Sequence, residues 1–234
     1  MNFIILAAGT GTRLKPYTKL TPKCLFNIGK GEVIIQRMVR LIKEIDGKAN
    51  ISVVLGYKWN LITPLLTNCK VFHNPFYKDS NSIASLWFAK DMLCDDTIII
   101  NGDVVLSEKL LEMVLQTTKS PAIFFDSTIK SNGDYNVQTL GEKVVIMSKE
   151  LNDYSGEYCG VTKLNKESAL KLANKICEMV EDEQYCEWYE TALVQMILDG
   201  SLNLFHYDVS DFDWAEIDSV NDLLLAKEIQ RNEH

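Results

Sequence analysis

The sequence predicts an α/β fold, in which helices cover a mostly parallel, mixed sheet and the C-terminal part adds a small β-rich and helical extension. Residues 2–8 form a continuous apolar run that ends at Gly9, which is typical of a parallel strand buried on both faces. Strand-like and helix-like segments then alternate as far as residue 120, and this rhythm predicts right-handed crossovers between parallel strands. Beyond residue 120, strand-like segments follow one another with few helices between them, so these residues form the extension.

The first part of the chain alternates regularly between the two kinds of element. Residues 33–45 have apolar side chains at helical spacing, and Gly47 ends this helix. Ser107 is placed to cap a later helix. In chain order the sequence predicts strand 2–8, loop 9–22, helix 33–45, strand 51–55, helix 59–66, strand 70–72, helix 82–92, strand 97–101 and helix 107–117.

The second part follows without a linker, so we expect a single domain over residues 1–234. A chain of 234 residues is long enough to bury most of its apolar surface in one core. The elements expected here are strands 122–125, 135–139, 143–147 and 158–164, helices 166–181 and 187–198, strand 202–207 and helix 220–230.

Charge is distributed unevenly along the chain. The whole sequence has 24 Lys and Arg against 32 Asp and Glu, for a net charge of −8. Residues 1–150 have 18 basic and 14 acidic side chains, whereas residues 151–234 have 6 basic and 18 acidic ones. The N-terminal part can therefore bind phosphate, and the acidic part can bind a metal ion or a cationic group. A nucleic acid is not expected as a partner, because no stripe of Lys and Arg with interleaved aromatic residues is present.

The apolar runs and the cysteines bear on location. No apolar run approaches the ~20 residues that a membrane-spanning helix needs, so membrane insertion is not expected. The first residues lack the pattern of an export signal, and the six cysteines are scattered without a CxxC pair. We therefore expect a cytoplasmic protein with reduced thiols and no zinc site.

Residues 6–25 form the most informative segment. Gly9 and Gly11 follow a buried strand, where the backbone can turn sharply and present N–H groups to an anion. Arg13 can bind two phosphate oxygens at once, and Lys23 supplies a compact charge. Taken alone, the glycines also fit an ordinary turn between a strand and a helix. A dinucleotide-binding fingerprint needs a further glycine where Leu14 stands, and the Gly-Lys-Ser/Thr of a Walker loop is absent.

This segment resembles the signature LAAGxGxRLxPxTxxxPKxL of the nucleotidyltransferases that activate sugar 1-phosphates and phosphocholine, and it matches every fixed position. The resemblance implies one Rossmann-like nucleotidyltransferase domain, with a nucleotide-binding part at 1–120 and an acceptor-binding part at 121–234. One departure is Gly31, which stands where the family usually has the proline of a Gly-Lys-Pro element. Later segments resemble the cytidylyltransferase branch: Gly56-Tyr57-Lys58, Asn74-Pro75, Asn81 to Leu86, Asn101-Gly102-Asp103 and Glu216-Ile217-Asp218.

The resemblance implies that a phosphate oxygen of an acceptor attacks the α-phosphorus of a nucleoside triphosphate and that pyrophosphate leaves. The branch favours CTP, with a phosphocholine-like acceptor or an amino-acid phosphate such as glutamine phosphate. Such a product would supply the decoration of a cell-surface polysaccharide such as a capsule. Two anions must come together in this reaction, so Mg²⁺ is the expected cofactor, with Mn²⁺ as an alternative.

The two metal ligands are expected to come from opposite ends of the chain. Asp103 follows a strand of the parallel sheet, at the edge where open α/β sheets bind ligands. Asp218 is the favoured second ligand and Glu216 its rival, since residues two apart on a strand point the same way. Asp218 alternatively caps the helix that follows it.

The remaining site residues are predicted from the same resemblance. Lys23 is expected at the α-phosphate and Arg13 at the β- and γ-phosphates. The further nucleotide-binding candidates are Leu6, Ala7, Ala8, Gly9, Thr10, Gly11, Thr12, Tyr57, Asn81, Ser85 and Gly102.

An acidic and aromatic set in the second part is the candidate acceptor site, because aromatic faces and carboxylates bind ammonium groups. For each aromatic member, packing in the core is the alternative. The members are Glu157, Tyr158, Trp188, Tyr189, Glu190 and Trp214.

Two other functions stay open at this stage. One is a uridylyl- or thymidylyltransferase acting on a sugar 1-phosphate. The other is a catalytically silent module that senses nucleotides, although a sensor would not need Arg13, Lys23, Asp103 and Asp218 together. A homodimer is also left open.

Overall fold

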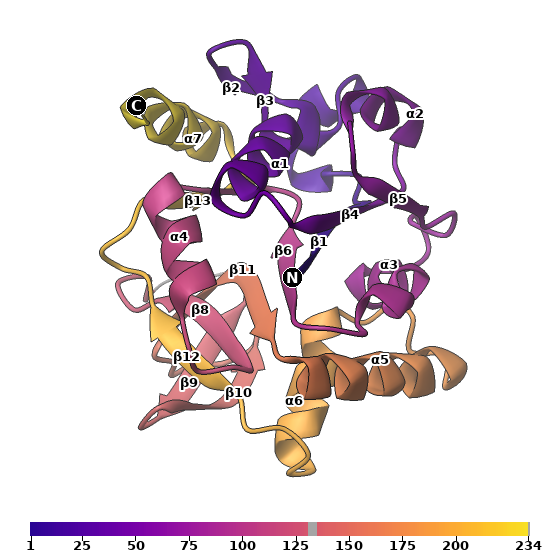
Figure 1. The fold of residues 1–234 in the computed structure, drawn as a ribbon, viewed down its shortest axis with the longest axis vertical. Coiled ribbons are helices and arrows are strands. Elements are labelled where there is room, and N and C mark those ends of the chain that lie inside the picture. The colour runs from indigo at the N-terminus through magenta and orange to yellow at the C-terminus, as the bar shows by residue number, and fades with distance from the viewer. Residues whose placement is uncertain (131–134, 234) are drawn as a thin grey trace.

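A nine-stranded mixed sheet runs through the computed structural model, which describes residues 1–130 and 135–233 (Figure 1). In order across the sheet its strands are β5 (Lys70–His73), β4 (Asn50–Leu55), β1 (Asn2–Ala7), β6 (Thr97–Asn101), β11 (Gly156–Leu164), β8 (Ala122–Asp126), β12 (Phe205–Asp208), β10 (Lys143–Ser148) and β9 (Asn136–Leu140). The first four pair in parallel, whereas β11 runs antiparallel to both β6 and β8. The predicted α/β fold with a mostly parallel first part is confirmed.

The β-rich part is continuous with this sheet rather than appended to it. β9 pairs with β11 as well as with β10, so β11, β8, β12, β10 and β9 form a closed circuit of pairings. The pairing of β11 shifts register between Tyr158 and Thr162, around Gly160, whose φ is +76°. A Cβ on Gly160 would lie 2.7 Å from Cγ2 of Val104. Glycine therefore permits both the backbone conformation and the close approach to the neighbouring segment.

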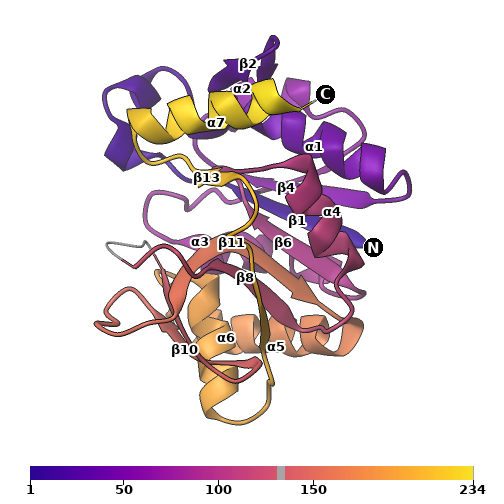
Figure 2. The same ribbon diagram turned by 90° about the vertical axis from the view of Figure 1, so that its left-hand side faces the viewer.

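Helices cover both faces of the sheet, and the alternating side chains of β1 show how. Phe3 and Ile5 belong to the core under one set of helices, and Ile4 and Leu6 to the core under the other. Figure 2 shows α1 above the sheet and α5 and α6 below it. The helices are α1 (Ile34–Ile45), α2 (Trp59–Ile62), α3 (Ser82–Phe88), α4 (Glu108–Gln116), α5 (Lys166–Glu181), α6 (Tyr189–Leu198) and α7 (Val220–Asn232).

Two small ladders complete the fold, and the sequence did not predict either of them. β7 (Val104–Leu106) pairs antiparallel with β13 (Trp214–Glu216), and β2 (Asn27–Gly29) pairs with β3 (Glu32–Val33). A third core cluster lies between these ladders and α7, and includes Ile28, Ala215 and Ala226. Strands of two or three residues are too short to give a periodic pattern, so Val33 was wrongly expected inside the helix that begins at Ile34.

Two predicted helices are shorter than the sequence suggested. The helix expected at 59–66 ends at Ile62 and continues as the 3₁₀ turn Thr63–Leu65. Pro64 explains this, because it has no N–H to donate to the preceding turn. The helix expected at 82–92 ends at Phe88 and is followed by the 3₁₀ turn Lys90–Met92.

All six cysteines are free thiols, and only Cys24 and Cys159 of them are buried. Among the residues described here, none of the helices has the length and apolar character that crossing a lipid bilayer requires.

Candidate active site

The glycine-containing loop after β1 is held by hydrogen bonds within the loop and by hydrogen bonds from the residues that follow β4. Gly11 has a φ of +63°, and a Cβ there would lie 2.9 Å from Cγ2 of Thr18. The buried Thr18 donates its hydroxyl proton to the carbonyl of Gly11 at 2.8 Å. Tyr57 donates to the Thr18 carbonyl at 3.0 Å, and Lys58 donates to the Leu20 carbonyl at 2.7 Å. The loop is therefore preorganised before any ligand binds.

The ends of β1 and β6 come unusually close together beside this loop. The N–H of Gly102 donates to the carbonyl of Leu6 at 2.9 Å. A Cβ on Gly102 would lie 2.7 Å from that same oxygen and 2.7 Å from Cβ of Ala7. Glycine at this position brings Asp103, the next residue, to the edge of the loop.

Lys23 lies between two carboxylates from distant parts of the chain. Its Nζ is 2.9 Å from Oδ2 of Asp103 and 2.6 Å from Oδ1 of Asp218. Burial by itself lowers the pKa of Lys23, but the charges of the two carboxylates outweigh burial and raise the pKa to about 12. Arg13 lies 2.8 Å from the other oxygen of Asp218, and nearly half of its side-chain surface is exposed.

The β7–β13 ladder brings the distant acids together. Glu216 pairs with Val104, directly after Asp103, and the N–H of Ile217 donates to the carbonyl of Asp103 at 3.0 Å. One carboxylate oxygen from each of Asp103, Glu216 and Asp218 lies within 4.8 Å of the others. Three carboxylates at this spacing fit a hard divalent cation, which prefers oxygen ligands. Both rivals for the second ligand thus lie beside Asp103.

The start of α7 fixes Asp218 without using its carboxylate as a cap. Ser219 is the N-cap, and its hydroxyl accepts from the N–H of Asp222 at 3.2 Å. Oδ2 of Asp222 accepts in return from the N–H groups of Ser219 at 2.6 Å and Asp218 at 3.0 Å. The alternative role of Asp218 as the helix cap is therefore wrong, and its carboxylate faces Lys23 and Arg13 instead.

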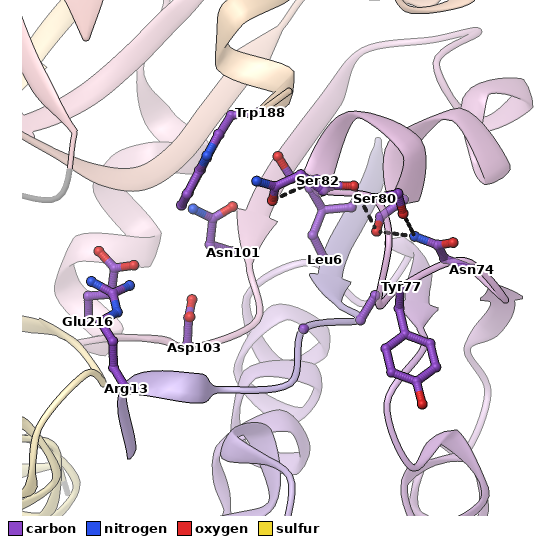
Figure 3. A pocket seen from close by; sticks show the side chains of 14 residues that line it. Leu6, Arg13, Asn74, Tyr77, Ser80, Ser82, Asn101, Asp103, Trp188 and Glu216 are labelled. Carbon is purple, nitrogen blue, oxygen red and sulfur yellow. Dashed lines mark hydrogen bonds between the residues drawn. The ribbon is translucent and has the colours of Figure 1, made fainter. Parts of the chain in front are cut away.

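A central cavity of about 190 Å³ opens at the carboxyl ends of β1 and β6. Figure 3 shows the two ends of this cavity. Trp188, Asn101, Asp103, Glu216 and Arg13 lie at one end, and Asn74, Tyr77 and Ser80 at the other, with Leu6 and Ser82 between them. The remaining lining residues are Ala8, Gly9, Asn81 and Ser85.

The end near Asn74 is a hydrogen-bonded polar wall. Asn74 is 1 % exposed, and its amide donates to the hydroxyls of Ser80 at 3.1 Å and Ser85 at 3.0 Å. Asn81 caps α3 by accepting from the N–H of Ser82. Sequence reasoning missed Tyr77 and Ser80, although their place after a parallel strand is a signal that could have found them, whereas Ser82 lies in the predicted segment from Asn81 to Leu86.

The other nucleotide-binding candidates lie around the same strand ends. Ala7, Gly11 and Gly102 line a small neighbouring cavity together with Lys23 and Asp103. Thr10 and Thr12 lie on the loop after β1, and Thr12 begins the 3₁₀ turn Thr12–Leu14. The hydroxyl of Tyr57, another of these candidates, lies 3.0 Å from the carbonyl oxygen of Thr18 and 3.3 Å from that of Lys19.

An acidic cavity of about 500 Å³ adjoins the central one, and Arg13 and Glu216 line both. Glu157 and Trp214, two of the acceptor candidates, line this second cavity. The indole N–H of Trp214 donates to Oδ2 of Asp126 at 3.0 Å. The other residues that line it are Ile129, Phe212, Asp213, Ala215, Asp218, Asp222 and Leu225.

Two acceptor candidates lie in the core, which corrects the expectation that they contact a ligand. Tyr158 and Tyr189 are 3 % and 0 % exposed, and their hydroxyl oxygens lie 2.6 Å apart. Thr162 completes this buried network, and burial raises the pKa of both tyrosines. Tyr158 and Tyr189 thus pack in the core, which was the alternative considered for each aromatic candidate.

Glu190 is buried as well, at 1 % exposed, and Trp188 is the one member of its segment that lines the central cavity. Burial raises the pKa of Glu190 to about 8. Hydrogen bonds from its own backbone and from the Asn101 side chain lower the pKa, but burial outweighs them. Glu190 is thus close to neutral at physiological pH, beside the wall of the cavity.

Comparison with known proteins agrees with this geometry. A model of the family described as Nucleotidyl transferase matches residues 2–143, and this chain belongs to that family. It is 25 % identical to the CTP:phosphoglutamine cytidylyltransferase of Campylobacter jejuni, over 95 % of this chain and 98 % of that protein. It is 26 % identical to the choline-phosphate cytidylyltransferase of Streptococcus pneumoniae, over 100 % of both. A 2-aminoethylphosphonate cytidylyltransferase of Lancefieldella rimae is 27 % identical over 95 % of this chain and 90 % of its own length.

Solved structures share the fold. The CTP:phosphocholine cytidylyltransferase of Streptococcus pneumoniae superposes with a TM-score of 0.81 at 23 % identity, covering 98 % of each chain. The inositol-1-phosphate CTP transferase of T. maritima gives a TM-score of 0.78 at 17 % identity, covering 100 % of this chain and 97 % of that one.

Proposed function

We propose that this protein is a Mg²⁺-dependent cytidylyltransferase. It moves CMP from CTP to a small phosphorylated acceptor that carries a cationic nitrogen, and it releases pyrophosphate. The observation that carries the proposal is the meeting of Lys23 and Arg13 with Asp103, Glu216 and Asp218 beside the central cavity. This is the charge arrangement that transfer of a nucleotidyl group between two anions needs.

The choice of CTP and of the acceptor class is supported by the relatives. The three relatives described above, which match over 90 % or more of their own length, are all named as cytidylyltransferases. The substrates in their names, phosphoglutamine, choline phosphate and 2-aminoethylphosphonate, share an amine or quaternary ammonium group and a phosphorus-centred acid. A product of this kind suits the decoration of a cell-surface polysaccharide, which is the role we propose.

The two parts of the chain divide the work. In the proposal, residues 1–120 bind the nucleotide, with the base at the Asn74 end of the central cavity and the phosphates at the loop after β1. Residues 121–234 bind the acceptor and supply Glu216 and Asp218. The acidic lining of the second cavity agrees with a cationic acceptor, because it attracts positive charge toward the reacting centre.

Lys23 and Arg13 provide positive charge where the reaction moves negative charge. An oxygen of the acceptor phosphate attacks the α-phosphorus, the bond to the β-phosphate oxygen breaks, and pyrophosphate leaves with that electron pair. Lys23, whose Nζ lies between Asp103 and Asp218, would place its ammonium group at the α-phosphate. The more exposed Arg13 binds the leaving pyrophosphate and can follow it out of the site.

Asp103, Glu216 and Asp218 would bind the Mg²⁺ ion. When bound, this ion would neutralise phosphate charge and align the two substrates. Because Lys23 and Arg13 are ion-paired with Asp218 in this structure, their side chains are already directed at the place where the phosphates would lie.

The test is pyrophosphate release from CTP, UTP and dTTP, with choline phosphate, glutamine phosphate or glucose 1-phosphate as acceptor, with Mg²⁺ or with EDTA. We expect the fastest release from CTP with one of the two nitrogen-containing acceptors, and none in EDTA. Faster turnover of UTP or dTTP with glucose 1-phosphate would replace the proposal with a sugar nucleotidyltransferase. Binding of nucleotide without release in any combination would identify a sensor.

A further inference from the structure

A buried arginine joins the two segments that follow the acids of the active site. Arg37, on α1, is 1 % exposed, and its guanidinium donates to the carbonyl of Leu106 at the end of β7, at 2.8 Å. The same guanidinium is ion-paired with the carboxylate of Glu233, directly after α7, and its Nε lies 3.2 Å from Oε2. β7 begins one residue after Asp103, and α7 begins two residues after Asp218. Arg37 therefore bridges the segments that lead away from these two acids.

Helix α7 depends on this contact, because it has few apolar side chains in the core. Ala226 and Ile229 are its buried apolar residues, whereas Leu224 is 55 % exposed. Figure 2 shows α7 lying over β13, with its C-terminal end near α1. A buried guanidinium that loses its counter-ion is strongly unfavourable, so the pair of Arg37 and Glu233 holds this end of α7 against α1.

The opposite end of α7 holds Asp218. The N–H of Asp218 donates to Oδ2 of Asp222 in the first turn of the helix. A helix of 13 residues spans about 20 Å and is hydrogen-bonded along its length, so movement at one end is passed to the other. β7 in turn pairs with β13, which contains Glu216. Arg37 thus fixes the far ends of two segments whose near ends hold Asp103 and Asp218.

We propose that Arg37 is a positioning residue of the metal site, and that by bridging β7 and α7 it sets the separation of Asp103 and Asp218. The metal site rests on the proposed function, whereas the link along α7 does not. Arginine suits this role, because its planar guanidinium presents several donors in a fixed geometry and binds a carbonyl and a carboxylate together.

Glu233→Gln is the direct test, since it removes the negative charge and keeps the size of the side chain. The end of α7 should then separate from α1 more often. We expect the amide hydrogens of Asp218 and Ser219, at the other end of the helix, to exchange about tenfold faster in the absence of any ligand. Deuterium exchange followed by mass spectrometry of a peptide covering 216–223 measures this rate, and a peptide covering 2–8 in β1 should exchange as in wild type.

Metal binding is the second measurement on the same variant. The dissociation constant of Mn²⁺ in the presence of CTP, followed by electron paramagnetic resonance, should rise about tenfold, as expected when the support of a metal ligand is lost. The kcat for CMP transfer at saturating Mg²⁺ should stay within about twofold of wild type, because the bound ion draws the carboxylate of Asp218 back into place.

Lys163→Met is the matched control for the loss of a buried cation. Lys163 is 7 % exposed and donates to the carbonyls of Val114, Leu115 and Thr117, at the end of α4, over 2.8–2.9 Å. This variant should lose stability too, because these carbonyls lose their donor. Its Mn²⁺ affinity and its exchange at residues 216–223 should be those of wild type.

The outcomes separate the inference from the function on which it rests. Unchanged exchange at residues 216–223 in Glu233→Gln overturns the positioning role, and so does an equal loss of Mn²⁺ affinity in Lys163→Met. If Glu233→Gln does not fold, Arg37→Lys replaces it, because lysine keeps the charge without the fork of donors; wild-type exchange and Mn²⁺ affinity in that variant overturn the role as well. If wild type binds no Mn²⁺ while the exchange result holds, the metal site of the proposed function fails and the link along α7 stands.

Discussion

Lys23 is the residue best placed to stabilise charge in the transition state. It is 9 % exposed and ion-paired with two carboxylates, so its charge is held in place at little further entropic cost. We expect Lys23→Ala to lower kcat about 10²–10³-fold, the usual effect of removing one preorganised charged contact. The measurement is kcat for CMP transfer, with circular dichroism to confirm the fold.

Lys19→Ala is the control for this change, since Lys19 is an exposed lysine of the same loop. It should keep wild-type turnover. Near-normal turnover in Lys23→Ala would show that Lys23 pairs with Asp103 and Asp218 for structural reasons only.

Glu190 makes stability depend on pH. Burial raises its pKa to about 8, so the folded protein binds this proton more tightly than the unfolded chain does. The stabilising effect is complete below about pH 4.5 and is lost as the pH rises through 8. As the pH rises from 5 to 9, the free energy of unfolding of Glu190→Gln should increase by about 2–4 kcal/mol relative to that of wild type. Urea unfolding at each pH measures this difference. The charged or titratable groups that influence Glu190 are Asp103, Lys149, Tyr135, Tyr158 and Tyr189.

A constant gap between the two proteins across this pH range would contradict the prediction, because it would mean that Glu190 does not titrate there. Glu187→Gln, an exposed change nearby in the sequence, should show no such trend.

The sequence predicted the place of a side chain in the site where several site residues occur together in one motif. The signature loop identified Lys23 and Arg13, and the structure brings both to Asp218. The acceptor set was predicted from composition alone, and composition does not say which way a side chain points. Tyr158 and Tyr189 therefore lie in the core, whereas Trp188, from the same segment as Tyr189, lines the cavity.

At the level of elements, the short β7–β13 ladder and the start of α7 position the acids. The capping box of Ser219 and Asp222 fixes the backbone N–H of Asp218. We expect Ser219→Ala to cost about 1 kcal/mol of stability and to raise the Mg²⁺ concentration for half-maximal activity about tenfold. Thermal unfolding and a Mg²⁺ titration of CMP transfer measure the two effects.

The cap of α4 offers a matched control. The hydroxyl of Ser107 accepts from the N–H of Leu110, which is the same kind of contact away from the acids. Ser107→Ala should lose similar stability with no change in the Mg²⁺ requirement. An equal shift in both variants would mean that the loss of stability, and not the position of Asp218, changes metal binding.

Elements were predictable in proportion to their length and pattern. The buried strand β1 and helix α1 gave clear apolar periodicity, and both are confirmed within one residue. The three-residue strands β7 and β13 gave none, because a ladder of that size depends on contacts between distant segments. The sequence thus predicted that Asp103 lies near Glu216 and Asp218, but it did not predict the β7–β13 ladder that brings them together.

For the molecule as a whole, the site lies where a basic and an acidic part of the chain meet. Asp103 comes from the part with 18 basic and 14 acidic residues, and Asp218 from the part with 6 basic and 18 acidic ones. In this structure Lys23 bridges them by ion pairs to each. A nucleotide with its metal ion would replace these pairs by stronger contacts to both parts, so binding should stabilise the whole fold.

This coupling predicts a thermal shift. At CTP and Mg²⁺ concentrations about 100-fold above the dissociation constant, we expect the Tm to rise by about 5–10 °C. EDTA should abolish the rise, and Asp218→Asn should remove most of it. Asp211→Asn should keep it, because Asp211 is an exposed acid on the turn before β13. A full shift in Asp218→Asn, or the same shift with CTP in EDTA, would mean that the nucleotide binds without joining the two parts through these acids.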